Sequence, residues 1–475
     1  MEGTWEFILF VEKMKLSFGP MLMHEAPWRA PLHPHQHCIT KSLQGTISFS
    51  LCLLLHAYLI ETGSIRDIYF TNLVLSIYGK LGLMQEADSL FHSIPNPNVV
   101  SWNTLMACYI HYGDVDRAAT MFSGIGRTRN VVTWNTLIAG YAHKRSCKET
   151  MILLHRMHQE SKLPNHVTFI SMLSGCGKPE DLDIGKVIHL YINGSGAMSG
   201  SRIVSKSDFI SKIKIGTSLV NMYGKCGDLL SAHRTFGELN EHDVVSWTAL
   251  ICTYSQLGRA NDALTLFRQM KEQGSSPNKL TLIGVLSAIS NVISLAQGKQ
   301  VHVLVILNGF NLDVDIASAL INMYGKCGNI NEAWLVFESV DSRPLVVWNA
   351  IIVACLDQKH YFLALLLFKE MLLKSLIPNE YTFASALAAC TCLMDLSLAT
   401  LIYSYIVEEG YMPDVVINNA LINLYGKFDQ LENAEYIFEK MSDRSEGTWA
   451  CMITVYSQRG EDRNALELFY DMLSD

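Results

Sequence analysis

The feature that most constrains this chain is a stretch of sequence that returns at an interval of 101 residues. The seven residues Asn-Met-Tyr-Gly-Lys-Cys-Gly begin at Asn221 and again at Asn322, and a looser copy begins at Asn423. Residues of other types keep the same interval, namely Trp247, Trp348 and Trp449, Ala263, Ala364 and Ala465, and Phe267, Phe368 and Phe469. A period that holds across unlike residue types predicts an array of repeats and not a single globular enzyme core.

Shorter units lie inside each long period. One unit opens at Val244 with Val-Val-Ser-Trp-Thr, and similar openings begin at Val99 and Val131. Units close on a Pro-Asn pair, as at Pro277-Asn278. Residues 244–278 and 279–313 form units of 35 residues, and residues 314–344 form one of 31 residues, which together make the long period.

Each unit is predicted to contain two short helices. Ala263, Leu266, Phe267 and Met270 follow the spacing of one helix face, whereas a strand would require strict alternation. We expect Gly258 to end the preceding helix, because glycine readily adopts a positive φ. We expect Ser276-Pro277 to stop the second helix, because proline cannot donate the helical hydrogen bond.

The composition fits stacked helical pairs. The chain is 49% hydrophobic and 17% charged, and its apolar residues are dispersed at helical spacing. A single pair exposes too much apolar surface, so neighbouring pairs must share a continuous core. The longest apolar run, residues 47–60, is interrupted by polar residues and is shorter than the roughly 20 residues that span a bilayer. We therefore predict no membrane segment.

The openings, the Tyr-Gly-Lys-Cys-Gly turn, the Ala-x-x-x-Phe-x-x-Met helix and the Pro-Asn close together resemble the pentatricopeptide repeat (PPR) proteins of land plants. The mixture of unit lengths is similar to the PLS subclass of that family. The resemblance implies an all-α fold, a right-handed α-solenoid (superhelix) of stacked helix-turn-helix pairs. The tetratricopeptide repeat is the nearest alternative, but its Trp-x-x-Leu-Gly-x-x-Tyr signature does not occur here.

The resemblance covers about residues 33–475, after an N-terminal non-repeat segment at 1–32. It predicts about thirteen units, at 33–67, 68–98, 99–130, 131–165, 166–212, 213–243, 244–278, 279–313, 314–344, 345–379, 380–414, 415–445 and a truncated unit at 446–475. The unit at 166–212 is long because of a Gly- and Ser-rich insertion near 193–205, a composition suited to a flexible loop.

The family resemblance implies that each unit faces one nucleotide of single-stranded RNA, read by the fifth and last residues of the unit. A last residue Asp accepts the central N–H of guanine or uracil, whereas Asn donates to the central lone pair of adenine or cytosine. As the family implies, Thr or Ser at the fifth position favours a purine, and Asn favours a pyrimidine. Carried to this chain, Thr217 with Asp243 prefers guanine, and Thr248 with Asn278 prefers adenine.

Four further pairs are expected to read cytosine and tolerate uracil. They are Asn72 with Asn98, Asn103 with Asn130, Asn135 with Asn165, and Asn349 with Asn379. The second residues Val100, Val132 and Val245 are expected to stack on the base faces. Ile170, Ile283 and Ala384 occupy the fifth position without a polar group and are expected to act as spacers. Ser318 with Pro344 and Asn419 with Ser445 are expected to give little or no code.

Structural explanations compete with these roles. Asn and Thr near a helix start are common N-caps, so an isolated Asn103 would more often be structural, but recurrence at one register favours base contact. The tryptophans are predicted to pack in the core. Lys80, Lys225, Lys326 and Lys427 recur at one register and are candidates for phosphate contact or for solvated turn lysines. The net charge of −8 argues for weak, salt-sensitive RNA binding.

No catalytic residue, metal site or cofactor is predicted. The twelve cysteines lack zinc spacing and are expected to be reduced thiols, mostly buried, and the cluster of His33, His35, His37 and Cys38 lacks further ligands. Many PLS relatives end in a DYW cytidine deaminase-like domain, which needs a His-x-Glu followed by a Cys-x-x-Cys. The single His-x-Glu at 158–160 lies in a predicted helix with no such pair after it, so we expect this domain to be lacking and the chain not to be an enzyme.

The sequence therefore predicts a factor that binds single-stranded organellar RNA and selects sites for cytidine-to-uridine editing or other processing. Catalysis would come in trans, from editing-complex proteins carrying a deaminase, with no membrane and no small-molecule substrate involved. Residues 1–32 lack the Arg-rich, acid-poor composition of a presequence, so a mitochondrial or, alternatively, chloroplast location follows from the family alone. The competing hypothesis is a helical scaffold that binds protein, or a truncated relative that does not bind RNA.

Overall fold

The computed structural model describes residues 56–57, 59–61, 67–195, 206–239, 241–408, 410 and 414–474. These residues form α-helices in consecutive pairs, with 3-10 turns at Gly126–Thr128 and Pro179–Asp181, and they contain no strand. The all-α class and the pairing of short helices are confirmed. The right-handed coil of the whole chain stays a prediction, as do the non-repeat segment at 1–32, the His-Cys cluster at 33–38 and the loop at 196–205, which lie outside the described residues.

The first helices of the pairs are α4 (Ile68–Lys80), α6 (Val99–Tyr112), α8 (Val131–His143), α10 (His166–Gly175), α12 (Lys206–Lys225), α14 (Val244–Gln256), α16 (Lys279–Val292), α18 (Val314–Lys326), α20 (Leu345–Asp357), α22 (Glu380–Leu393), α24 (Val415–Lys427) and α26 (Glu446–Gln458). The second helices are α5 (Met84–His92), α7 (Val115–Gly124), α9 (Cys147–Gln159), α11 (Leu182–Gly194), α13 (Leu229–Gly237), α15 (Ala260–Glu272), α17 (Leu295–Leu307), α19 (Ile330–Ser339), α21 (Tyr361–Leu373), α23 (Leu396–Glu408), α25 (Leu431–Lys440) and α27 (Asp462–Ser474).

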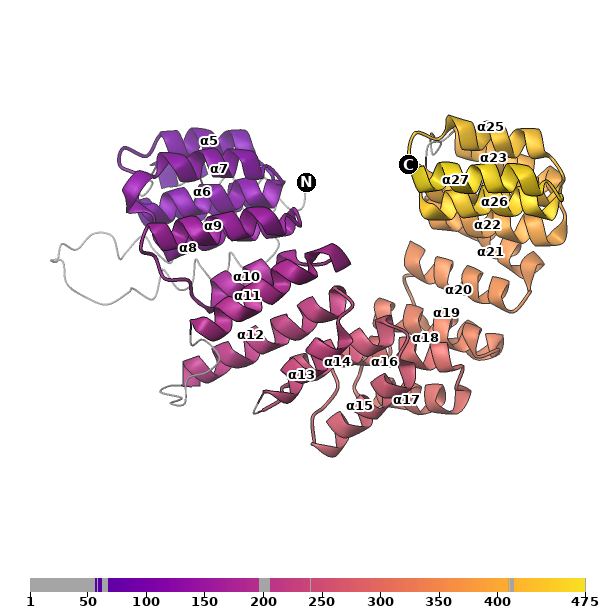
Figure 1. The fold of residues 1–475 in the computed structure, drawn as a ribbon, viewed down its shortest axis with the longest axis horizontal. Coiled ribbons are helices and arrows are strands. Elements are labelled where there is room, and N and C mark those ends of the chain that lie inside the picture. The colour runs from indigo at the N-terminus through magenta and orange to yellow at the C-terminus, as the bar shows by residue number, and fades with distance from the viewer. Residues whose placement is uncertain are drawn as a thin grey trace. The chain divides into compact units, whose positions relative to one another are not determined.

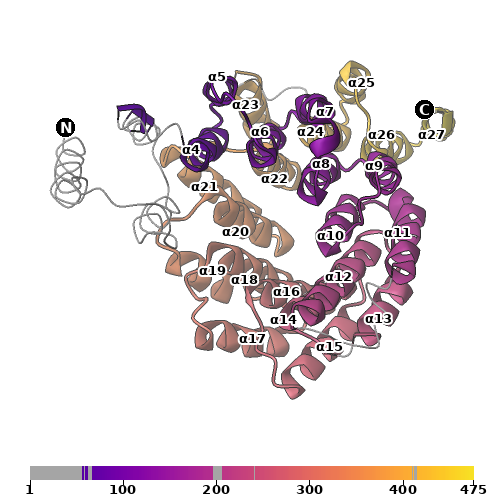
Figure 2. The ribbon, with the colours of Figure 1, turned by 90° about the vertical axis from the view of Figure 1, so that its left-hand side faces the viewer.

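The chain divides into two compact parts, Met1–Leu137 and Ile138–Asp475. In the first part α4 packs against α6, and each of these helices packs against the second helix of its own pair. In the second part the first helices pack against one another in chain order from α10 to α26, as Figure 1 shows from magenta to yellow. Figure 2 shows α14, α16 and α18 side by side in this row. Successive first helices therefore form a continuous layer within the second part.

Close approach of the first helices depends on a recurring glycine. A Cβ on Gly325 of α18 would lie 2.6 Å from the Cβ and 2.9 Å from the Cα of Ala354 in α20. Gly79, Gly224 and Gly426 occupy the same register, and an added Cβ on each would clash with a side chain of the next first helix. The Gly of the repeated Tyr-Gly-Lys segment therefore sets the spacing between units.

The tryptophans pack in the core, as predicted. Trp134, Trp247 and Trp348 are buried, and each packs edge-on against a phenylalanine of the preceding second helix. The ring centroids of Phe337 and Trp348 are 4.9 Å apart, and those of Phe438 and Trp449 are 5.1 Å apart. Where it occurs, this aromatic pair joins a second helix to the first helix of the next unit.

The predicted end of α14 is confirmed, whereas the predicted cause of the end of α15 is wrong. Gly258 follows α14 with a φ of 74°. Helix α15 ends at Glu272, four residues before Ser276, because Gly274 adopts a φ of 75° and Ser275 donates its backbone N–H to the Met270 carbonyl. Pro277 thus lies in the connection and does not stop the helix.

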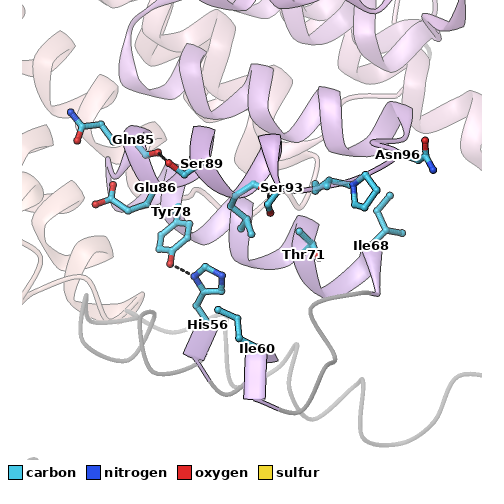
Figure 3. Close-up of a pocket in the computed structure, with 13 residues that line it drawn as sticks. His56, Ile60, Ile68, Thr71, Tyr78, Gln85, Glu86, Ser89, Ser93 and Asn96 are labelled. Carbon is cyan, nitrogen blue, oxygen red and sulfur yellow. Dashed lines mark hydrogen bonds between the residues drawn. The ribbon is translucent and has the colours of Figure 1, made fainter.

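Buried polar contacts also join neighbouring units. The His189 Nδ1 atom lies 2.8 Å from the Tyr223 hydroxyl, and His302 contacts Tyr324 at the same distance. Figure 3 shows the corresponding pair of His56 and Tyr78 beside a hollow of about 1150 Å³ whose lining includes none of the expected reading residues. The contacts of His189 and His302 connect a second helix to the first helix of the following pair.

The described cysteines are free thiols, and most are buried. Burial raises the pKa of Cys108, Cys355 and Cys390 to about 11, which keeps them protonated near neutral pH. Within the described ranges no three or more His, Cys, Asp and Glu residues form a group that could hold a metal ion. No helix among these residues is long and apolar enough to cross a membrane.

Candidate nucleic-acid interface

The last residues of many units are the N-caps of the next first helix. The Asn98 side-chain oxygen accepts the backbone N–H of Ser101, and the Asp243 carboxylate accepts that of Ser246. Asn165, Asn278 and Asn379 form reciprocal capping boxes with a threonine three residues later. The helix start therefore holds the side chain of the last residue in one orientation.

Capping uses one polar atom of each amide or carboxylate and leaves the second polar atom unused. The Asn278 Oδ1 accepts two hydrogen bonds of 2.9 Å from Thr281, whereas its Nδ2 has no partner among the described residues. The same holds for Asn98, Asn130 and Asn379. In Asp243 one carboxylate oxygen caps the helix, and the other is an unused acceptor in this part of the chain. A capped Asn thus presents a donor, and a capped Asp presents an acceptor.

The structure brings two of the expected reading pairs into direct contact. Asn349 donates from Nδ2 to the Asn379 Oδ1 at 3.1 Å, and Asn103 donates to the Asn130 Oδ1 at 3.5 Å. In these two units the fifth residue therefore lies beside the last residue of the same unit, which caps the following first helix. The two residues can contact the same small ligand group.

Thr248 reaches its expected partner through a third residue. Its hydroxyl shares a 2.7 Å hydrogen bond with the hydroxyl of Thr281, which in turn donates to the Asn278 Oδ1. The fifth residue Asn349 lies one long period later and accepts from Thr382 in the same way, at 2.7 Å. The two units thus have one architecture with either Thr or Asn at the fifth position.

Several fifth residues have buried polar atoms without a partner. Atoms of this kind in the described residues include the Oδ1 of Asn72, Asn103 and Asn419 and the Oγ1 of Thr217. An unpaired buried polar atom costs about 1–3 kcal/mol of stability. The structure shows no direct contact between Asn72 and Asn98 or between Thr217 and Asp243. Thr217 lies well inside α12, which begins at Lys206, and not near a helix start as expected.

The remaining expected site residues lie as follows. Asn135 of α8 is 8% exposed, and Asn165 caps α10. Val100, Val132 and Val245 are 57%, 57% and 55% exposed, although each belongs to a hydrophobic residue type. They lie one helical turn before the fifth residue, on the same face of the helix. Exposed aliphatic side chains beside polar pairs suit the flat face of a base.

The capping role falls on residues that sequence reasoning did not assign to it. We weighed capping for the fifth residues, but Asn103 and Asn349 instead use their side chains to contact the last residue of the same unit. The sequence contains the signal, because Asn, Asp or Ser precedes Ser or Thr by three residues at 98, 130, 165, 243, 278, 379 and 445.

The positions expected to act as spacers, or to give little or no code, differ from one another. Ile170, Ile283 and Ala384 are half-buried and carry no polar side-chain group. Pro344 occupies the N-cap position of α20 without a side-chain hydrogen bond, whereas the Ser445 side chain caps α26 through Thr448. Lys80, Lys225, Lys326 and Lys427 are exposed in the last turn of their helices, where a cation also stabilises the helix dipole.

Comparison with known families finds pentatricopeptide repeats along most of the described chain. The model described as PPR repeat matches residues 70–96, 100–126, 217–244, 316–343, 346–376, 419–445 and 447–475. The PPR repeat family model matches 129–178 and 242–291, and the pentatricopeptide repeat domain model matches 366–428.

Similar proteins include pentatricopeptide repeat-containing proteins of Arabidopsis thaliana. A mitochondrial one is 32% identical over 88% of this chain and 54% of its own length. A chloroplastic one is also 32% identical, over 88% of this chain and 46% of its own length. The chain thus spans about half the length of these relatives.

A solved structure has a similar fold. The crystal structure of the pentatricopeptide repeat protein PPR10 in complex with an 18-nucleotide psaJ RNA element matches with a TM-score of 0.61 at 20% identity. The match covers 93% of this chain and 65% of that one. It establishes the same helical-repeat architecture.

Proposed function

Because this chain belongs to the pentatricopeptide repeat family of plant type, we propose that it binds single-stranded RNA and reads it one nucleotide per unit. The observation that carries the proposal is the pairing of a fifth residue with a capped last residue that keeps one polar atom unused. The fold shared with PPR10, which was crystallised with an RNA element, supports the same ligand class.

The donor left unused in the Asn103 and Asn130 pair matches a cytosine edge. Asn130 has an unused Nδ2 donor for the central lone pair of the base, and Asn103 lies beside it at the fifth position. Uracil presents an N–H at the centre of this edge and opposes the Asn130 donor. We therefore propose cytosine as the preferred base of the unit at 99–130.

The unit at 213–243 has the opposite polarity at its last residue. The unused oxygen of Asp243 accepts the central N–H of guanine, and the unpaired Thr217 hydroxyl lies in the fifth position. The next unit, with Asn278, donates to adenine instead. Guanine followed by adenine is therefore the proposed central sequence, with pyrimidines before it.

The role in the cell is proposed at a coarser level. We propose that the protein is a PLS-subclass site-recognition factor for organellar RNA, guiding cytidine-to-uridine editing or another processing step that a partner catalyses. The mitochondrial and chloroplastic names of its relatives support an organellar location.

Selection from a random single-stranded RNA pool, at a stated salt concentration, tests the proposal. We expect enrichment of pyrimidines, one unselected nucleotide, and then guanine and adenine. Replacing both Asp243 and Asn278 by alanine should remove the guanine and adenine preference only. Folded protein that enriches no sequence would contradict RNA reading and favour a protein-binding scaffold.

A further inference from the structure

An arginine before the last residue is anchored in the same way in three units. The Arg129 Nε donates to the Phe122 carbonyl at 2.9 Å, and the Arg343 Nε donates to the Phe337 carbonyl at 3.1 Å. In the third unit the Arg444 Nε donates to Phe438 at 3.2 Å. Each bond reaches a carbonyl in the last turn of a second helix, where helical partners run out. The Phe438 carbonyl also accepts the backbone N–H of Met441.

The same guanidinium groups also stack on the phenylalanine ring. Their central carbon lies 4.4 Å from the ring centroid of Phe122 for Arg129, 4.8 Å from that of Phe337 for Arg343, and 4.5 Å from that of Phe438 for Arg444. Each ring packs against the tryptophan of the next first helix. The arginine therefore spans the joint between two units.

The other units expected to read a base fill this position with another constraining residue. His242 replaces arginine before Asp243, and its ring stacks on Phe236 with centroids 3.9 Å apart and planes 7° apart. In the other four such units proline, which fixes φ, precedes the last residue, at Pro97, Pro164, Pro277 and Pro378. A stacked side chain or a proline thus precedes each of the last residues expected to read a base.

We infer that Arg129 is a positioning residue for base recognition, which holds the backbone before Asn130 so that the unused Nδ2 of Asn130 faces the nucleotide. Two anchors act on this short segment. Arg129 joins it to the end of α7, and the contact of Asn130 with Thr133 joins it to the start of α8. Without the first anchor, Asn130 can still cap the helix, but the approach of its backbone is no longer fixed. This inference rests on the proposed reading of RNA.

The chain supplies a matched control for this role. Arg343 makes the same carbonyl bond and ring contact, but it precedes Pro344, which has no polar side chain to position. Replacing either arginine removes equivalent structural contacts. Arg129→Ala and Arg343→Ala should therefore lower the unfolding temperature by similar amounts, whereas base selection should change in the first variant alone.

The experiment selects a random single-stranded RNA pool on the full chain and its variants. Asn130→Asp marks the nucleotide of this unit, since it should convert cytosine preference to uracil there. Arg129→Ala should reduce cytosine preference at that nucleotide by about fivefold or more, from loss of one well-oriented base contact. Arg129→His should retain most of the preference, because His242 fills this register elsewhere.

The outcomes separate this inference from the function on which it rests. If the wild-type protein shows no base preference that Asn130→Asp shifts, both the reading of RNA by this unit and the role of Arg129 are wrong. If the preference exists and Arg129→Ala leaves it unchanged, only the positioning role is overturned. Equal loss of selection at all nucleotides in Arg129→Ala and Arg343→Ala would also overturn it, because that pattern reflects stability alone.

Discussion

At the residue scale, the proposed function gives one side chain two tasks that use different atoms. Asn278 caps α16 with its oxygen, and its amide nitrogen is left for a ligand. Because the cap fixes the side chain before RNA arrives, little conformational entropy is lost when a base binds. The capping hydrogen bonds that stabilise the fold therefore also orient the Asn278 amide nitrogen, which the cap itself does not use.

The two tasks of Asn278 can be separated by substitution. Asn278→Asp keeps a good N-cap, so the free energy of unfolding should stay within about 0.5 kcal/mol, while base preference moves from adenine to guanine. Asn278→Ala should lose about 1 kcal/mol of stability together with the preference. Denaturant titration and RNA selection on the same samples measure both effects. If stability falls equally in the two variants, the capping hydrogen bond is not what stabilises the start of this helix.

The fifth residue is predicted to select between base classes. Thr248→Asn should move the preferred base from adenine to cytosine by about tenfold, because Asn349 already occupies this architecture one period later. The reciprocal change, Asn349→Thr, is the control and should move its own nucleotide toward adenine. Binding measured on RNAs that differ at one nucleotide checks both. Under the scaffold hypothesis neither variant changes any affinity for RNA.

At the element scale, the recurring glycine decides how closely first helices pack. Gly325→Ala should destabilise the protein by about 1–3 kcal/mol, because the new Cβ meets the backbone of Ala354 and cannot be accommodated by a rotamer change. This loss outweighs the roughly 1 kcal/mol that alanine gains over glycine in a helix. Gly237→Ala is the control, since an added Cβ there meets no atom within 4 Å. Thermal unfolding should separate the two variants, and equal stability would contradict the close approach.

Much of the element structure could be predicted from the sequence, because helical periodicity and the long repeat constrain it strongly. The buried tryptophans follow from an aromatic residue recurring at one register. The end of α15 was missed because Gly274, and not Pro277, supplies the positive φ that closes the helix. The caps at the last residues were missed because a cap is recognisable only once the helix start is placed. The Arg129 contact depends on how the chain folds back over the end of α7, which no local pattern reveals.

At the scale of the whole molecule, the net charge of −8 opposes phosphate binding, so the proposed recognition of RNA depends heavily on contacts to bases. Units that contact only their neighbours make roughly additive contributions to both stability and binding. A single altered reading pair should then change the preference at one nucleotide and leave the others unchanged.

The recurring lysines are predicted to contribute to RNA affinity by the same amount whatever the RNA sequence. Lys326→Gln should weaken binding to all RNAs by a similar factor and reduce the magnitude of the slope of log affinity against log salt concentration by about 0.7, the value for one phosphate contact on a single strand. The exposed Lys271 of α15, which is not in this register, provides a control. Affinity measured over a series of salt concentrations distinguishes the two. An unchanged slope would assign Lys326 to the helix terminus alone.

The capping duty of the last residues also bears on how such a protein changes over generations. Asparagine and aspartate are both good caps, and their codons differ by one base, so exchange between them leaves the helix start intact. A lineage can therefore acquire a new target by single mutations that do not first pass through an unstable fold. Because these residues cap helices, the proposed base preference can change at one unit at a time while each helix start stays intact.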